Sequence, residues 1–530
     1  MVFDVLVLGG EVLDGSGAPA YRADVGIIGD RIAKLGKLAG QQARTTIKAE
    51  GRTVCPGFID IHSHDDYNLP ANPLARGKTA QGVTTVVTGN CGFSPAPVVG
   101  DKRHLLREAA SFLDTGLDYD WQSFSEFLQR LPPRAVNVAP LVGHVTLRCC
   151  VMGMEDRPPQ AVEMERMTSL LVEAMEAGAF GMSTGLIYPP SCFAEPEEIT
   201  ALARVAARHG GAYFTHMRDE GPGVMDSVRE AIAVGRGSGA RVQISHLKIA
   251  NKANWGSAGQ VLGLIDEARE QGMALACDQY PYTAASTGMK ILLPQWVHSG
   301  ADQGVGASLA GAETRKKARG EILQMVAQGA SRIGEWKDVL VANSPSQPDY
   351  VGLNLTQIAE RETKEPVDAL LDLLVADNGK TLGVFFSIGE EDMFEIMRHP
   401  AVAVGSDGIF LGVPGQPDRT KPHPRYFGTF PRVIGRYSRE AAVLGLPEAV
   451  RKMTSLPADI LGLTARGRIE PGFAADLVVF DPATVIDTAT YQEPHRMPIG
   501  IETVLVNGIA VVEKSRGTEN TPGLLLRRPT

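Results

Sequence analysis

The stretch GFIDIHSHDD at residues 57–66 places two histidines directly after a short apolar run. The β-branched and aromatic residues of this run predict a buried strand, and the polar cluster predicts the loop at its carboxyl end. His62 and His64 are two positions apart, so in extended backbone their side chains point to the same side. This stretch therefore predicts a strand that ends in a pair of imidazoles.

Seven further apolar runs have the same pattern, because each ends in a polar or glycine-rich cluster. These runs are 82–92, 136–144, 178–186, 212–218, 242–248, 274–282 and 401–408. Between them, segments such as 196–210 and 258–272 carry apolar residues at the three-four spacing of an amphipathic helix. Eight alternations of strand and helix favour an α/β fold in which residues 57–467 form a (β/α)₈ TIM-like barrel.

The spacing of the later runs predicts an insertion before the last barrel strand. His216 and His246 are 30 residues apart and His246 and Asp278 are 32 apart, the length of one strand, one helix and two loops. Asp278 and Asp407, however, are 129 apart. We therefore expect an inserted lid at about residues 287–380, lying over the barrel mouth, because the loops after the strands build the active face of such barrels.

Both ends of the chain predict short strands. Residues 1–56 contain alternating runs with glycine-rich turns, and residues 475–482 and 502–513 resemble them. The last of these predicts a hairpin, because Asn507-Gly508 is the preferred turn dipeptide. We expect residues 1–56 and 468–530 to form one small β-sandwich-like domain, and we interpret the N-terminus as its first strand rather than as a signal peptide.

The composition narrows the range of partners. The 530 residues are 44% hydrophobic and 21% charged, with a net charge of −9, and no apolar run reaches the roughly 18–20 residues that cross a bilayer. The basic stripe of a nucleic-acid-binding protein is missing. Six cysteines are too few for a disulfide framework. We expect a cytoplasmic protein that acts on a small molecule, not on nucleic acid or membrane; the sequence leaves its oligomeric state open.

Six chemically active side chains fall at the carboxyl ends of the predicted strands. Parallel strands of a barrel gather these ends at one mouth. Imidazoles, a thiolate and a carboxylate together are typical ligands of Zn²⁺. The candidate ligands are His62, His64, Cys91, His216, His246 and Asp407. The pattern therefore predicts a zinc-dependent enzyme.

The same stretches carry a resemblance to a known family. FIDIHSHDD, GVTTVVTGNCGFS, GAFGMSTGLIYPP, THMRDEG, ISHLK, YPYTAAST, SDG, PHPRYFGTFPRVIGRYSR and GRIEPGFAADLVVFD span essentially the whole chain. Together they resemble the D-aminoacylase (N-acyl-D-amino-acid deacylase) branch of the amidohydrolase superfamily. This resemblance implies a metal-dependent barrel with a small β-domain and a lid, which cleaves N-acyl groups from D-amino acids.

The resemblance also implies how the ligands are divided. Cys91, His216 and His246 would hold one zinc ion tightly, with an open fourth position. His62 and His64, with Asp407 and a bridging Cys91, would form a second, weaker site. Related cyclic amidohydrolases bridge two metals with a carboxylated lysine at the fourth strand, whereas here that strand ends in Ser183-Thr184-Gly185. This difference argues against a hydantoinase.

The expected chemistry is hydrolysis of an amide. Water is a poor nucleophile at neutral pH, and an amide carbonyl is a poor electrophile. Zn²⁺ lowers the pKa of bound water from about 15.7 to about 7 and polarises the carbonyl, so it makes both groups more reactive. Asp407 is the expected proton shuttle, first as general base toward the water and then as general acid toward the leaving amine. An aspartate that only caps the following helix is the structural alternative.

A free α-carboxylate on the substrate needs a cationic partner, and an arginine is the best planar one. Lys248 lies two residues after His246, and Arg425 in PHPR matches the carboxylate-binding arginine of the family. Tyr280, Tyr282 and Ser286 in YPYTAAST supply hydroxyls at the mouth of the seventh strand. The link between Asp407 and Arg425 is longer than this family leads us to expect, which makes Arg419 a second candidate.

Two other functions remain open at this stage. The same metal centre would also suit another amide substrate, such as a D-configured dipeptide or a cyclic ureide. A non-enzymatic scaffold is disfavoured, because such degenerate proteins lose ligands and all six candidates are present. His144 either lines the pocket or is a structural histidine, and Asp65 and Asp66 are expected to orient the ligand histidines or to cap the following helix.

Overall fold

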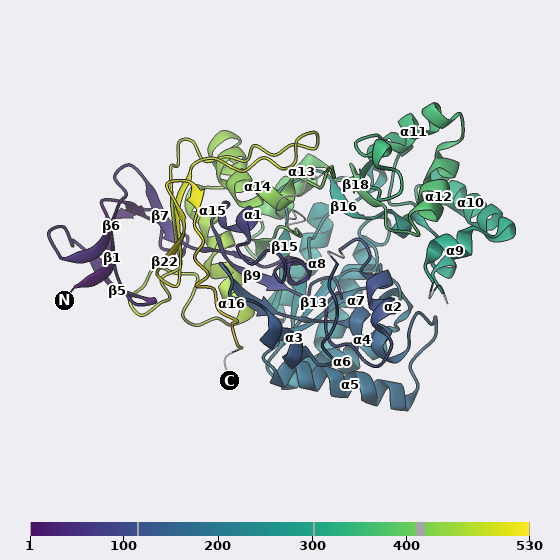
Figure 1. The fold of residues 1–530 in the computed structure, drawn as a ribbon, viewed down its shortest axis with the longest axis horizontal. Helices are drawn as coiled ribbons and strands as arrows, with labels where there is room; N and C mark the ends of the chain where they lie inside the picture. The colour runs from purple at the N-terminus through teal and green to yellow at the C-terminus, as the bar shows by residue number, and fades with distance from the viewer. Residues whose placement is uncertain (1, 114–115, 300, 302, 410–418, 529–530) are drawn as a thin grey trace.

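The computed structural model describes residues 2–113, 116–299, 301, 303–409 and 419–528. Figure 1 shows three regions along the longest axis of the molecule. Strands from both termini lie at the left, parallel strands with their helices occupy the centre, and the segment that carries α9 (Val305–Leu309), α10 (Ala312–Ala327), α11 (Leu355–Glu362) and α12 (Pro366–Ala376) lies at the right.

Each of the eight predicted central runs contains a strand. They form two wholly parallel sheets, β10-β9-β8 and β11-β12-β13-β14-β15-β19. The third run is divided in two at Leu141, whose backbone N–H donates to Thr88 O at 2.9 Å. The strands are β8 (Phe58–Asp60), β9 (Val83–Thr88), β10 (Asn137–Pro140), β11 (Val142–Gly143), β12 (Gly181–Gly185), β13 (Ala212–His216), β14 (Arg241–Ile244), β15 (Leu275–Gln279) and β19 (Val402–Val404).

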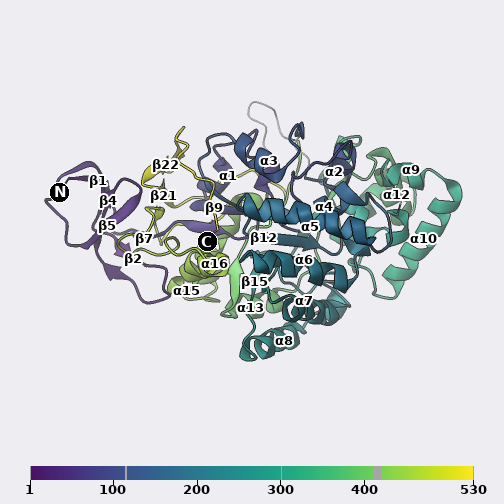
Figure 2. The same cartoon turned by 90° about the horizontal axis from the view of Figure 1, so that it is seen from below.

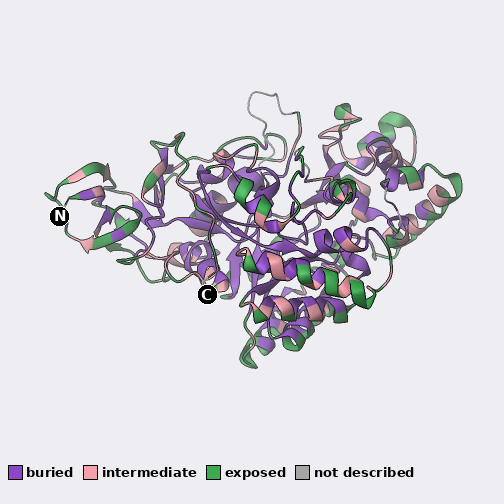
Figure 3. Ribbon diagram, turned by 60° about the horizontal axis from the view of Figure 1, so that its bottom comes forward, coloured by how far each residue is buried: buried purple, intermediate pink, exposed green. Residues whose placement is uncertain are grey.

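Amphipathic helices follow these strands, and both helical segments expected from the sequence are confirmed. In α6 (Pro196–Arg208), proline begins the first turn and Ile199, Leu202 and Ala206 form the buried stripe. Figure 2 shows successive helices side by side around the strands, and in Figure 3 the strands are buried while the helices carry exposed residues outward. Besides α6 these helices are α1 (Arg76–Thr79), α2 (Arg103–Ala109), α3 (Phe124–Arg130), α4 (His144–Val151), α5 (Ala161–Glu176), α7 (Val224–Ser238), α8 (Ala258–Glu270), α13 (Glu390–Arg398), α14 (Arg425–Arg432), α15 (Leu446–Met453) and α16 (Ser455–Leu461).

The loops after β8 and β19 lie side by side. Asp407 N donates to His62 O at 2.8 Å, His64 N donates to Gly408 O at 3.0 Å, and Ser63 and Gly408 form an isolated parallel bridge. These backbone bonds join the first and last strands of the central region at their carboxyl ends. They bring the two histidines of the first run to the aspartate of the last.

The two termini share a sheet. β7 (Thr53–Pro56) pairs antiparallel with β20 (Leu477–Phe480) in the seven-stranded order β23-β22-β21-β20-β7-β2-β3. The predicted hairpin is confirmed, with positive φ at Asn507 (49°) and Gly508 (80°), the conformation that suits this dipeptide. The remaining terminal strands are β1 (Phe3–Leu8), β2 (Glu11–Val12), β3 (Tyr21–Arg22), β4 (Asp24–Ile28), β5 (Arg31–Gly36), β6 (Ala43–Lys48), β21 (Ile501–Val506), β22 (Ile509–Glu513) and β23 (Arg516–Gly517).

The segment between β15 and β19 has its own sheet and its own core. β16 (Ala285–Gly288), β18 (Leu382–Phe385) and β17 (Val339–Asn343) pair antiparallel in that order. Helices α9 to α12 pack around them, and the side chains of Met289, Leu370 and Phe385 belong to one buried cluster. Among the described helices, none combines the length and the apolar character that a membrane crossing needs.

Candidate metal centre

The six candidate ligands come together although they are contributed by five different strand ends. His62 and His64 follow β8, Cys91 follows β9, His216 ends β13, His246 follows β14 and Asp407 follows β19. All six side chains are buried. They form two groups whose donor atoms lie within 4.8 Å of one another, and Cys91 belongs to both. The arrangement thus has the convergence that the sequence pattern predicts.

Three of these residues have a left-handed backbone conformation that side chains rarely adopt. The φ angles of Cys91, His246 and Asp407 are 54°, 36° and 47°. Such conformations persist only where the surroundings enforce them, and they concentrate at functional sites. His246 N, for example, donates to Asp278 Oδ1 at 2.9 Å. The strain supports a functional role for this cluster.

The first group contains Cys91, His216 and His246. Cys91 Sγ lies 3.4 Å from His246 Nε2. The ring centres of His216 and His246 are 4.3 Å apart, and the ring planes meet at 82°. Among the described residues, neither ring nitrogen of His216 has a hydrogen-bond partner, although the side chain is buried. A buried imidazole without a partner is costly, and a metal ion would remove that cost. One sulfur and two nitrogens suit Zn²⁺.

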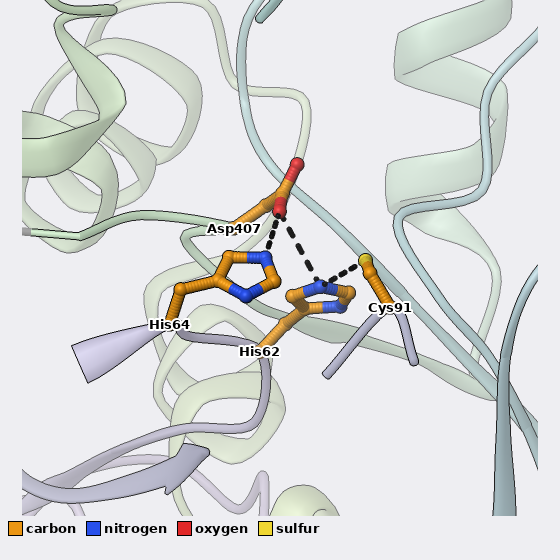
Figure 4. Close-up of side chains that lie close together, drawn as sticks. All are labelled: His62, His64, Cys91 and Asp407. Carbon is orange, nitrogen blue, oxygen red and sulfur yellow. Dashed lines mark hydrogen bonds and ion pairs between the residues drawn. The ribbon is translucent and has the colours of Figure 1, made fainter. Parts of the chain in front are cut away.

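The second group contains His62, His64, Cys91 and Asp407, shown in Figure 4. Asp407 Oδ1 lies 3.1 Å from His64 Nε2 and 3.4 Å from His62 Nε2, and His62 Nε2 lies 3.2 Å from Cys91 Sγ. The thiol therefore stands between the two groups. Both nitrogen and oxygen donors point toward one small volume, as a second cation would require.

Burial and neighbouring charges set the protonation of these groups. Burial alone would raise the pKa of Asp407, but the guanidinium of Arg425 and the imidazoles of His246 and His62 hold it well below its usual range. Burial lowers the pKa of His64 to about 4 and lowers that of His216 well below 6.5. Asp407 is therefore a carboxylate and both imidazoles are neutral near pH 7, the forms that accept a proton or bind a metal.

Two carboxylates that the sequence did not single out hold the ligand histidines. Asp278 lies 3.2 Å from His62 Nδ1, and Glu220 lies 2.9 Å from His246 Nδ1. Such bonds fix the tautomer and orientation of a metal-binding imidazole. Glu220 is four residues after His216, and Asp278 lies in the seventh run, so their positions carried a signal. Their roles depend on contacts across strands.

A buried ion pair lies behind the second group and was also missed. Lys78 Nζ donates to Asp60 Oδ2 at 2.7 Å and to Ser406 Oγ at 2.7 Å. Asp60 Oδ1 accepts Ser406 N at 2.8 Å, one residue before Asp407. This network links β8 to the loop after β19. No local pattern indicates it, because Lys78 lies on the short helix α1.

The predicted substrate contacts divide into two sets. The side chains of Lys248, Tyr280 and Ser286 line the pocket that holds His216, His246 and Asp407. Lys248 Nζ binds Glu220 and lies 2.8 Å from His246 Nδ1. Tyr282 is not in this lining: its hydroxyl donates to Pro424 O at 3.4 Å, and the guanidinium of Arg432 lies over its ring.

Arg425 is buried beside the pocket. Its Nη2 lies 3.0 Å from Asp407 Oδ2, and its guanidinium lies 4.7 Å from the ring centre of Tyr280. Within the described part of the chain, its Nε and Nη1 have no hydrogen-bond partner. Arg419, the second candidate, is exposed, and residues 410–418 of the long link lie outside the described residues.

Two further lining residues were not predicted. Tyr188 and Thr287 line the same pocket, and their hydroxyl oxygens are 2.9 Å apart. Tyr188 is in the GLIYPP stretch, so the motif contained it. His144 is structural, because it binds Ser191 Oγ at 2.7 Å and Glu198 Oε1 at 2.9 Å.

Parallel strands whose carboxyl ends converge on buried imidazoles, a thiol and a carboxylate define the class of metal-dependent hydrolases. The chain belongs to the amidohydrolase family: the family model matches residues 45–278 and 358–512. The protein is accordingly a metal-dependent hydrolase that acts on amide bonds. This agrees with the resemblance found in the motifs.

Two similar proteins come from Alcaligenes xylosoxydans xylosoxydans. Its N-acyl-D-glutamate deacylase is 40% identical over 527 residues, covering 99% of this chain and 96% of that protein. Its D-aminoacylase is 38% identical over 529 residues, covering 99% and 98%.

Solved structures agree with these sequence matches. An N-acyl-D-glutamate deacylase from Bordetella bronchiseptica, complexed with zinc and a phosphonate inhibitor that mimics the tetrahedral intermediate, is 36% identical with a TM-score of 0.84, covering 99% of this chain and all of that one. A D-aminoacylase studied for the role of its binuclear metal centre is 38% identical with a TM-score of 0.84 over the same shares. A D-hydantoinase, 15% identical with a TM-score of 0.56, shares the fold alone.

Proposed function

We propose that this protein hydrolyses the amide bond of N-acyl-D-amino acids to a carboxylate and a free D-amino acid. The observation that carries the proposal is the buried group of Cys91, His216 and His246 in a chain that matches two deacylases over nearly its full length. The orphaned nitrogens of His216 and the mixed sulfur and nitrogen donors fit zinc.

Each group of donor atoms has a separate part in this proposal. Cys91, His216 and His246 hold the tightly bound zinc, and His62, His64 and Asp407, with Cys91 shared, form a weaker second site. Bound zinc supplies a water of lowered pKa and polarises the scissile carbonyl. Asp407 accepts the proton of that water at a carboxylate oxygen and returns it to the leaving amine. Its low pKa keeps it unprotonated before the reaction.

The substrate carboxylate is assigned to Arg425, with Lys248, Tyr280 and Ser286 around it. Arg425 supports this role because two of its nitrogens lack a partner among the described residues while the whole side chain is buried. A carboxylate of the substrate would satisfy them. Tyr282, which contacts Arg432 and Pro424, acts in this proposal by supporting the backbone near Arg425.

The architecture that we propose follows the sequence expectation. The eight parallel strands at residues 57–467 form a (β/α)₈ barrel, the strands of 1–56 and 468–530 form a small β-domain, and the segment at about 287–380 is a lid. The backbone bonds between the loops after β8 and β19 support the barrel, and the separate core of the inserted segment supports the lid. The few unpaired cysteines support a cytoplasmic location.

The test is a panel of substrates assayed with zinc-loaded and chelator-treated enzyme. We expect hydrolysis of N-acetyl-D-amino acids, weak or no hydrolysis of their L-enantiomers and of a hydantoin, and loss of activity on chelation that one equivalent of zinc restores. Faster turnover of a D-dipeptide or a cyclic ureide would instead assign the protein to a different amidohydrolase activity.

A further inference from the structure

The turn that carries Cys91 has a left-handed backbone at three of its four residues. It spans residues 89–92, directly after β9, and Gly89, Cys91 and Gly92 have φ angles of 77°, 54° and 80°. Glycine adopts this conformation freely, but a residue with a Cβ atom keeps it only where the surroundings enforce it. Cys91 belongs to both groups of donor atoms. The position of its thiol therefore depends on what holds this turn.

The buried hydroxyl of Ser183, on β12, joins the two ends of the turn. Its Oγ accepts the backbone N–H of Gly92 at 2.9 Å and donates to the backbone oxygen of Gly89. In a hydrogen-bonded β-turn, the carbonyl of the first residue accepts the N–H of the fourth directly. Here the hydroxyl stands between these two groups, because one hydroxyl oxygen both donates and accepts. Ser183 therefore closes the turn that carries Cys91.

The backbones of β11 and β12 lie directly against the same turn. A Cβ atom added at Gly185 would lie 2.1 Å from Cys91 O, and one added at Gly143 would lie 2.1 Å from Gly92 O. These contacts leave no room for a side chain between the strand ends and the turn. No residue of β12 belongs to either group of donor atoms. This strand thus supplies no candidate ligand of its own, but it packs against the ligand that follows β9.

We propose that Ser183 is a positioning residue for the metal centre: its hydroxyl holds the turn in the conformation that brings the thiol of Cys91 to both groups, and so sets the affinity for zinc. Without the hydroxyl, the buried N–H of Gly92 and the oxygen of Gly89 lose this partner, which favours another conformation of the turn. The thiol then leaves its place 3.4 Å from His246 Nε2. The inference rests on the proposed zinc site and adds a residue outside the set of ligands.

Zinc affinity is the first measurement of this role. When the zinc-loaded enzyme is titrated with a chromogenic chelator, Ser183→Ala should show a Kd for zinc about 10–100-fold higher than the wild type, the usual effect of losing a group that orients a ligand. Ser183→Thr keeps a hydroxyl and should retain most of the affinity. Thr184→Val is the matched control and should keep the wild-type Kd. Thr184 is the buried neighbour on β12, but its hydroxyl bonds Tyr213 and Thr215, each at 3.0 Å.

The absorption spectrum of cobalt-substituted enzyme is the second measurement, because a cobalt–thiolate bond gives a charge-transfer band. We expect a full band for each bound ion in the wild type and in Thr184→Val, and a weaker band in Ser183→Ala. A merely structural role of Ser183 would lower the free energy of unfolding in urea without weakening this band.

The outcomes separate this inference from the proposed function. If the wild type has no cobalt–thiolate band, Cys91 does not hold the metal, and the proposed centre fails together with the role of Ser183. If the wild type has the band and Ser183→Ala keeps both the band and the wild-type Kd, only the role of Ser183 is wrong. The same holds if Thr184→Val weakens zinc binding as much as Ser183→Ala does. Should Ser183→Ala not fold, Ser183→Thr decides: zinc binding retained supports the role, and zinc binding lost in the folded variant overturns it.

Discussion

At the scale of single residues, the centre places three of its candidate ligands on strained backbone. Cys91, His246 and Asp407 each have a positive φ, which costs roughly 1–3 kcal/mol per residue. In return, three side chains from three loops reach one point: Cys91 Sγ is 3.4 Å from His246 Nε2 and belongs to the same group as Asp407. The strained backbone at these positions lowers the stability of the fold, and it allows the candidate ligands to converge.

Asp407→Asn is the residue-scale test of the proton shuttle. The amide keeps the shape of the side chain but cannot accept the proton of a water, so we expect kcat to fall by at least about 10²-fold. Zinc bound by Cys91, His216 and His246 should remain at one equivalent, measured by atomic emission. Near-normal turnover at full zinc content would remove Asp407 from the mechanism.

Arg425→Ala tests the carboxylate partner. We expect KM for an N-acetyl-D-amino acid to rise by at least about tenfold, because a charge-assisted contact is lost. KM for the corresponding carboxyl-amide analogue should change much less. Because Arg425 also lowers the pKa of Asp407, the acid limb of the kcat profile should move to higher pH. Equal effects on both substrates would place the carboxylate elsewhere.

How far the site could be predicted also depends on individual residues. His62, Cys91, His216 and Asp407 were predicted because a rare residue type at a strand end is visible in one local stretch. The roles of Glu220 and Asp278 were missed, since each depends on a contact with a histidine from another strand or loop. Lys78 was missed because its contacts with Asp60 and Ser406 join segments that lie far apart in the sequence.

At the scale of elements, the positions of the candidate ligands depend on how the ends of neighbouring strands pack against one another. The strands themselves were predictable, because short β-branched runs fill a buried parallel sheet. The division of the third run at Leu141 was not, because its first half pairs with β9 and its second half with β12, and both partners lie in other parts of the chain. The order of the strands likewise depends on pairing between distant segments.

Gly405→Ala tests whether the link after β19 positions His62. A methyl group at this position would lie 2.7 Å from His62 Cβ and 3.0 Å from Asp278 Oδ1, so one of these groups must shift. A misplacement near 1 Å costs about 10²-fold, and we expect a loss of turnover of that order with the tightly bound zinc retained. Gly263→Ala on α8 is the matched control, because nothing lies within 4 Å of its added methyl group. Unchanged turnover in Gly405→Ala would contradict the positioning role.

At the scale of the whole molecule, distant parts of the chain meet. The terminal strands share one sheet through β7 and β20, and the segment between β15 and β19 contributes residues such as Thr287 and Phe385 to the lining of the pocket at the metal centre. The strand patterns at the two ends led us to expect that the termini meet, and the long gap before Asp407 led us to expect an inserted segment. The helices and sheet inside the insertion were not predicted in detail, because its core forms only when its own strands pair.

A buried histidine in the insertion predicts a dependence of stability on pH. Burial lowers the pKa of His298 to about 3, and its Nε2 bonds Lys290 O at 3.1 Å. The unfolded chain takes up a proton near pH 6.5 that the folded protein refuses, so stability is complete above pH 6.5 and is lost as the pH falls toward 3. The loss attributable to His298 is at most about 1.4 kcal/mol per pH unit.

Urea unfolding between pH 7.5 and pH 5 measures this effect. In His298→Gln, whose amide can still donate to Lys290 O, the free energy of unfolding should fall less steeply below pH 6.5 than in the wild type. His104→Gln, which changes an exposed histidine, should leave the wild-type slope intact. Identical slopes for His298→Gln and the wild type would show that His298 does not resist protonation in the fold.

Zinc K-edge X-ray absorption on enzyme loaded with one equivalent of zinc tests the proposed metal centre most directly. We predict one sulfur neighbour at about 2.3 Å and nitrogen or oxygen neighbours at about 2.0–2.1 Å, with the sulfur lost together with the tightly bound ion in Cys91→Ala. A spectrum of the active wild-type enzyme with only nitrogen and oxygen around the zinc would contradict the account, because Cys91 would then not hold the ion.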